Sequence, residues 1–145
     1  KSWGNATWYL INTLAYKIND ESHVGELVNQ LYKICDNLPC IDCRDHAIML
    51  LTKNNFKNIN NKQQLILFML EFHNAINVKL GKNKFTIEEN NKLYSRGNTK
   101  AIINNYIEMM GHQNYNEKAL LHSYRRKQFI INFKKYIYAN SSKYQ

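Results

Sequence analysis

The chain has 145 residues, 44% of them hydrophobic and 12% aromatic, so it can bury the core of one domain and is too apolar for general disorder. Its formal net charge of +9 is compatible with a nucleic acid, an acidic protein or an anionic ligand as partner. Three cysteines are too few for the disulfide framework of a small secreted domain. We find no signal-peptide pattern and no apolar run of bilayer length, and therefore expect no membrane span.

Apolar residues recur at helical spacing along most of the chain, and no segment shows the alternation that is typical of a strand. Five glycines and one proline leave few residues that would interrupt helices. The helices that this pattern predicts span about 5–18, 24–37, 39–52, 62–80, 86–96, 99–110 and 116–139.

Capping residues support two of these boundaries. Gly81 directly follows the fourth helix, at the position where a left-handed residue ends many helices. Thr86 and Glu89 form a capping-box pattern at the start of the fifth helix. The sequence thus predicts an all-α fold, with a four-helix bundle and a short fifth helix in residues 1–97 and a helical extension in residues 98–145.

The predicted extension is basic, because it holds eight Lys or Arg and two Glu, which is +6 of the net charge. Arg125, Arg126 and Lys127 are consecutive and would suit a nucleic acid. A solvated basic face is the simpler interpretation, and docking onto the bundle or onto an acidic partner stays open. Aromatic residues such as Tyr124 and Phe129 indicate a core or an interface rather than a base-stacking platform. We therefore do not expect nucleic acid as a partner.

Residues 38–46 read Leu-Pro-Cys-Ile-Asp-Cys-Arg-Asp-His and contain two of the three cysteines. Pro39 favours the first turn of a helix, so we expect both Cys40 and Cys43 in that turn. The partial positive charge and the unpaired N–H groups of a helix N-terminus stabilise a thiolate. This spacing is typical of a redox-active dithiol, while half of a zinc site or two buried thiols are the alternatives.

The fourth predicted helix carries polar residues on one face. His73 and Asn77 are four residues apart and share that face, Asn74 borders it, and Lys79 and Lys82 follow at the helix end. An imidazole, two amides and two cations suit a ligand with a ring system and phosphates, such as a dinucleotide. The alternative is a solvated polar face whose cations complement the helix dipole.

Three motifs occur in order at intervals of about one helix: Trp-Gly-x-x-x-Trp at 3–8, Leu-Pro-Cys-x-x-Cys-Arg-x-His-Ala at 38–47, and His-Asn-x-x-Asn-x-x-Leu-Gly-Lys at 73–82. Together they resemble the Erv/ALR family of FAD-linked sulfhydryl oxidases. The second motif resembles most the branch that large cytoplasmic DNA viruses encode. The resemblance covers residues 3–94, about two thirds of the chain.

This resemblance implies a bundle whose short fifth helix is perpendicular to the others and whose mouth binds FAD. It also implies that Cys40 exchanges with the dithiol of a substrate, that Cys43 passes the electrons to FAD, and that dioxygen is reduced to hydrogen peroxide. The family pattern assigns FAD contacts to Gly4, Trp8, Asn12, Cys43, His46, Phe68, His73, Asn74, Asn77, Lys79, Lys82 and Tyr94.

The sequence departs from the family pattern at several of these positions. Asn12 stands where a histidine is usual, and Phe68 and Tyr94 stand where tryptophans are usual. The positions of the common structural disulfide are Leu70 and Ile87, so this resemblance predicts that the bond is missing here.

The resemblance also implies partners. No second Cys-x-x-Cys exists, so substrate electrons must arrive directly at Cys40, from a thioredoxin-like protein or from client viral proteins. It further implies a homodimer through the first two helices, in the host cytoplasm and, as a second location, in the virion.

The alternative function is a non-enzymatic zinc-binding or nucleic-acid-binding helical module. Cys40, Cys43 and His46, with Cys35 or His73, could supply zinc ligands. Cys40, Cys43 and His46 are too close together on one helix to coordinate zinc with good tetrahedral geometry, so we expect no metal site. Cys35 lies in an apolar stripe and is interpreted as a buried structural thiol.

Overall fold

The computed structural model describes residues 2–113 and 119–145, and these residues contain helices and no strand, which confirms the all-α prediction. The expected start of the last helix, near residue 116, lies outside the described residues. The α-helices of the described residues are α1 (Ser2–Lys17), α2 (Val24–Asp36), α3 (Ile41–Lys53), α4 (Lys62–Lys79), α5 (Ile87–Tyr94), α6 (Thr99–Gly111) and α7 (Leu120–Ala139).

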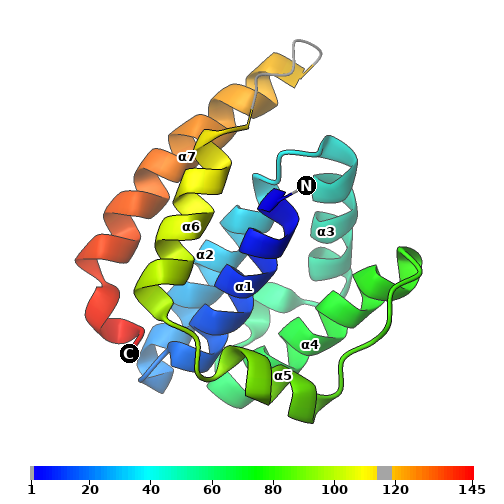
Figure 1. Cartoon of the computed structure of the whole chain (residues 1–145), viewed down its shortest axis with the longest axis vertical. Coiled ribbons are helices and arrows are strands. Elements are labelled where there is room, and N and C mark those ends of the chain that lie inside the picture. The colour runs from blue at the N-terminus through cyan, green and yellow to red at the C-terminus, as the bar shows by residue number, and fades with distance from the viewer. Residues whose placement is uncertain (1, 114–118) are drawn as a thin grey trace.

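The helices α1 to α4 form the predicted bundle, and the short α5 lies across the ends of α1 and α4 (Figure 1). The last two helices, α6 and α7, lie on the opposite side of α1 from α4. There α6 packs along the length of α1, and α7 packs on α6. The extension is therefore a layer of the molecule and not a tail that leaves it.

One continuous core joins the bundle and the extension. Leu10 and Leu14 of α1 and Leu31 of α2 are fully buried in it, together with Phe133 and Ile137 of α7. Burial of such a side chain stabilises the fold by about 1.5–3 kcal/mol. The boundary that the sequence predicts between residues 97 and 98 stays a prediction, but the apolar side chains on its two sides belong to one core.

Two caps shape the segment between α4 and α5. Gly81 has a φ of 73°, its N–H donates to the carbonyl of Val78 (3.1 Å), and the N–H of Lys82 donates to the carbonyl of Asn77 (2.7 Å). This pair of bonds is a Schellman motif, which turns the chain sharply. Thr86 then opens α5 with the predicted capping box. Lys79 before this turn and Lys82 at its end both line one cavity, which is described below.

The C-terminus is held against α2 by a polar cluster. The carboxylate of Glu26 accepts hydrogen bonds from the hydroxyl of Tyr136 (2.6 Å) and from Nζ of Lys143 (3.0 Å). The hydroxyls of Tyr136 and Tyr144 are 2.6 Å apart. These contacts fix α7 and the following turn to the first half of the chain.

Candidate active site

The two cysteines of the Cys-x-x-Cys motif form a disulfide at the start of α3, with Cα atoms 5.2 Å apart. The helix begins at Ile41, two residues later than predicted, because Cys40 has an extended backbone and serves as the N-cap. Its sulfur accepts a hydrogen bond from the N–H of Cys43 (3.2 Å), the third residue of the helix. Both sulfurs therefore lie at the positive end of the helix dipole.

A cavity of about 380 Å³ opens beside this disulfide, between α1, α3 and the end of α4. Its volume lies in the range of small-molecule and cofactor sites. Six residues that the sequence predicts as cofactor contacts line it: Gly4, Trp8, Cys43, His46, Lys79 and Lys82. Cys40 is not among the lining residues, so the two cysteines differ in their relation to the cavity.

Trp8 and His73 form an aromatic wall next to the cavity. Their rings are stacked, with centroids 3.9 Å apart and an interplanar angle of 14°, and Phe72 meets Trp8 edge-on at 5.6 Å. His73 is only 5% exposed, and its Nδ1 has no hydrogen-bond partner among the described residues. Burial and the nearby charge of Lys82 lower the pKa of His73 to about 4, so the ring is neutral at pH 7.

The amides at the end of α4 hold the backbone of the next segment. The side chain of Asn74 donates to the carbonyl of Phe85 (2.9 Å) and accepts from its N–H (2.8 Å). The side chain of Asn77 donates to the carbonyl of Asn83 (3.3 Å). Their predicted contacts with the adenosine part of FAD stay a prediction, and neither residue lines the cavity.

Four other predicted cofactor residues also lie outside the cavity lining, namely His73, Asn12, Phe68 and Tyr94. Asn12 is buried and donates to the carbonyl of Trp8 (2.9 Å), while its Oδ1 has no partner among the described residues. Phe68 packs between Phe72 and the loop after α3, and Tyr94 is buried next to α1.

Charged groups are distributed unevenly around the dithiol. Lys79 and Lys82 bring two cations to the cavity, and Asp42 brings one anion. Partial burial and the charge of Lys79 lower the pKa of His46, which favours its neutral form. Outside the cavity, Arg44 donates to Asp36 of α2 (2.8 Å) and ties the start of α3 to the end of α2.

Cys35 is buried, as predicted, and is 3% exposed. Burial, with a smaller contribution from Asp36, raises the pKa of its thiol to about 12. Its side chain nevertheless borders the cavity, which the sequence did not predict.

Sequence reasoning also missed the apolar part of the cavity. Phe72 and Ile76 line it together with Lys79. Their spacing of four and three residues places them on one face of α4, so helical periodicity could have identified them. A contact of His122 in α7 was not predicted either. Its Nε2 lies 2.7 Å from the carbonyl oxygen of Leu38, and no local signal could have revealed a contact across 84 residues.

The residues present fit a flavin dinucleotide. A Cβ atom on Gly4 would meet no atom within 4 Å, so space is open at this cavity-lining residue. Trp8 in the lining suits a planar ring, the two lysines suit phosphates, and the buried Nδ1 of the neighbouring His73 has no partner among the described residues. No group of three His, Cys, Asp or Glu residues in the described parts of the chain could hold a metal ion.

Over residues 5–96 the sequence matches the model of the Erv1/Alr family, and the chain belongs to this family. It is 34% identical over 86 residues to a putative FAD-linked sulfhydryl oxidase of Invertebrate iridescent virus 3, covering 57% of this chain and 58% of the relative. It is 31% identical to a probable FAD-linked sulfhydryl oxidase of Fowlpox virus, covering 51% and 77%. It is 28% identical to a FAD-linked sulfhydryl oxidase of African swine fever virus, and this match covers 69% of this chain and 86% of the relative.

The chain thus spans somewhat more than half the length of the iridescent virus relative. The family match ends at residue 96, so α6 and α7 lie outside it. No solved structure matches the chain significantly. In the described residues, no helix is long and apolar enough to cross a membrane.

Proposed function

We propose that this chain is an FAD-dependent thiol oxidase that forms disulfides in protein substrates. One observation carries the proposal: the Cys40–Cys43 disulfide stands at the edge of the cavity, with Cys43 in its lining and Cys40 outside it. One sulfur is thereby available to a ligand in the cavity, and the other to a substrate outside it. The names of the viral relatives support the same activity.

Gly4, Trp8, His46, Lys79 and Lys82 would hold FAD in the cavity. When bound, FAD supplies an acceptor for the two electrons of the reduced dithiol and passes them to dioxygen, which yields hydrogen peroxide. The protein itself contributes the position of the dithiol and the exclusion of water by its apolar wall.

The exchange with substrate uses only the residues of α3. A substrate thiolate attacks Sγ of Cys40, forms a mixed disulfide and releases Cys43 as a thiolate at the N-terminus of the helix. A second substrate thiolate then attacks the substrate sulfur of this mixed disulfide and releases Cys40. The substrate dithiol becomes a disulfide, and the disulfide of the protein becomes a dithiol.

The relatives belong to viruses that carry their own oxidases of this name, which supports a viral role. We accordingly propose that its dithiol substrates are thioredoxin-like proteins or client viral proteins. We also propose that it acts in the host cytoplasm and in the virion, and that it assembles as a homodimer.

The test uses the purified chain and dithiothreitol. We expect a yellow protein whose flavin spectrum is released on denaturation, and oxygen consumption with dithiothreitol as donor. Cys43→Ser should keep the flavin and lose its reduction by dithiothreitol. A colourless wild-type protein, or a Cys43→Ser variant with the wild-type rate, would refute the proposal.

A further inference from the structure

A second hollow, which we call the α2–α7 groove, lies between the end of α2 and the first half of α7 and measures about 360 Å³. Phe129 and Phe133 lie at its base, and Lys33 of α2 and Arg125 of α7 contribute cations to its walls. The groove extends to Asn37, which precedes Cys40 by three residues. The family match does not include α7, and nothing in the proposed FAD site uses this groove.

We propose that the α2–α7 groove binds an extended, acidic segment of the protein whose dithiol is oxidised. This inference rests on the proposed function and adds to it the place and the chemistry of substrate binding.

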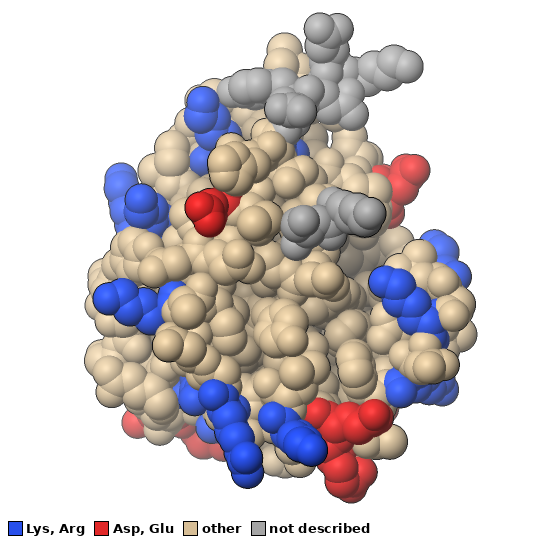
Figure 2. Space-filling model, viewed as in Figure 1, with Lys and Arg blue, Asp and Glu red and all other residues tan. Residues whose placement is uncertain are grey.

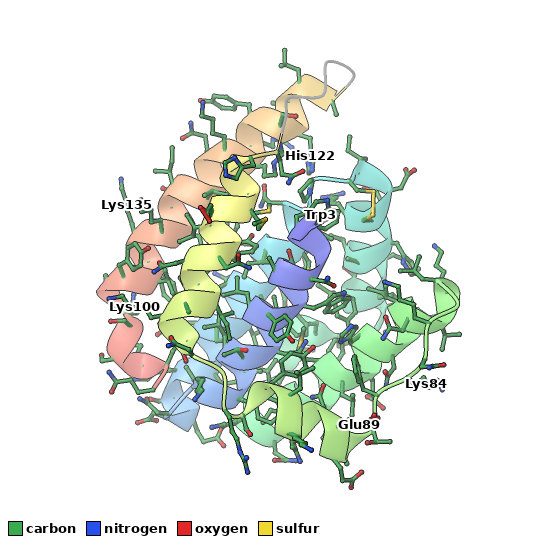
Figure 3. All side chains as sticks on the ribbon, viewed as in Figure 1. Trp3, Lys84, Glu89, Lys100, His122 and Lys135 are labelled. Carbon is green, nitrogen blue, oxygen red and sulfur yellow. A yellow bond between two sulfur atoms is a disulfide. The ribbon has the colours of Figure 1, made fainter. Side chains whose placement is uncertain are left out.

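The first support is the position of the groove relative to Cys40. The loop before α3 has two sides: the side chain of Leu38 lines the FAD cavity, and the carbonyl of Leu38 bonds to His122 of α7 at 2.7 Å. Cys40 is partly exposed and does not line the cavity. The disulfide and His122 lie at the same end of the molecule (Figure 3). A polypeptide in the groove would therefore lead directly to the sulfur that substrate attacks.

The second support is charge. Lys33 and Arg125 are exposed, and neither makes an ion pair with any residue that the structure describes. The one acid in the groove, Asp36, is already paired with Arg44 (2.8 Å). Uncompensated positive charge at a binding site increases the association rate and selects an acidic partner.

The third support is the composition of the walls. Gln30, Gln128 and Asn132 place amides along the groove, and Tyr124 is 56% exposed beside them. Amides can pair with an extended backbone, and an exposed tyrosine over a groove is a frequent anchor at protein interfaces. On the face that Figure 2 shows, Lys and Arg form separate groups and no continuous band.

The test compares two synthetic peptides that carry Cys-Gly-Pro-Cys between four flanking glutamates or four flanking lysines. The dithiol forms serve as substrates, and fluorescein-labelled forms with serine in place of cysteine report binding by anisotropy, independently of activity. At low ionic strength we expect the acidic peptide to bind at least about tenfold more tightly, and to lose this advantage as salt rises. We expect its kcat/KM to exceed that of the basic peptide by a similar factor through KM.

The variants Lys33→Glu and Arg125→Glu should each weaken binding of the acidic peptide about tenfold. Their kcat/KM for that peptide should fall much further than their rate with dithiothreitol. Lys135→Glu is the matched control, because it makes the same change of charge on α7 at a residue that does not line the groove and lies at the outer edge of the molecule (Figure 3). It should leave both measurements unchanged.

Equal binding of the two peptides would overturn the inference, as would equal effects of the groove variants and Lys135→Glu. Displacement of the acidic peptide by a twenty-nucleotide oligothymidine at lower concentration than by unlabelled peptide would assign the groove to nucleic acid instead. If the chain binds no flavin and does not oxidise dithiothreitol, the proposed function fails, but the anisotropy measurement still decides what the groove binds.

Discussion

His73 illustrates how the fold changes the chemistry of one residue. Its ring stacks on Trp8 with a centroid distance of 3.9 Å, and burial lowers its pKa to about 4. The neutral ring keeps one nitrogen as an acceptor, and Nδ1 has no partner in the described chain. His73 does not line the FAD cavity itself, but its neutral ring supports Trp8, which does.

The low pKa of His73 predicts a loss of stability in acid. Between pH 6.5 and 4 the unfolded chain binds a proton that the folded chain does not, so the free energy of unfolding decreases as the pH falls through this window. We expect His73 to contribute about 2 kcal/mol to this decrease, after a reduction for residual solvent screening. Urea denaturation of the flavin-free protein at pH 7 and pH 4.5 should show it, and His73→Gln should remove that part. An unchanged pH dependence in the variant would contradict the assignment.

His122 is predicted to position the redox loop. The bond to the carbonyl of Leu38 restrains the residues before Cys40, so His122→Ala should shift the equilibrium between disulfide and dithiol toward the dithiol by up to about fivefold. The shift is measured in glutathione buffers. His122→Gln, which keeps a donor, should restore part of it, and His112→Ala, at an exposed residue, should have no effect. If His122→Ala lowered the melting temperature but left the disulfide–dithiol equilibrium unchanged, His122 would have only a structural role.

Among the elements, the turn after α4 determines where the two cavity lysines, Lys79 and Lys82, lie. The Schellman motif reverses the chain within Leu80–Lys82, and the amide of Asn74 fixes Phe85 further along. Both lysines then reach one cavity although a helix end separates them. The sequence identified this helix end, but not its role in bringing the charges together.

Gly81 has a φ of 73°, a conformation that side chains with a Cβ rarely adopt, so Gly81→Ala should destabilise the fold by about 1–2 kcal/mol. Gly81→Asn should cost less, because asparagine tolerates this region. Gly25→Ala is the control, since Gly25 lies in α2 with open space around it and should stabilise the fold slightly. Chemical denaturation measures all three, and equal effects at the two glycines would contradict the interpretation.

For the molecule as a whole, α6 and α7 matter because they follow the end of the family match at residue 96. Helix α6 covers α1, and Tyr136 of α7 donates to Glu26 of α2; the resemblance predicts a homodimer through α1 and α2. A homodimer of this chain would therefore need surface of α1 or α2 that the extension leaves open. Sedimentation of the full chain tests the predicted dimer.

Phe133 of α7 is 1% exposed in the shared core, so Phe133→Ala should destabilise the protein by about 3–5 kcal/mol. Both tryptophans, Trp3 and Trp8, lie in α1, so their fluorescence reports on the unfolding of this bundle helix. If bundle and extension unfold as one unit, the substitution shifts the fluorescence and circular dichroism transitions together. An unchanged fluorescence transition would show that residues 98–145 unfold separately.

The family resemblance implied six of the residues around the cavity, whereas the all-α class, most helix boundaries within two or three residues, and the dithiol could be predicted from the residues alone. These features depend on local rules: helical spacing, caps at Gly81 and Thr86, and the chemistry of Cys-x-x-Cys. The tertiary structure decided that α7 returns to the dithiol through His122, that Asn74 and Asn77 hold backbone, and that Cys35 borders the cavity. The physical reason is that side-chain periodicity tells which face of a helix is buried, but not which distant helix covers it.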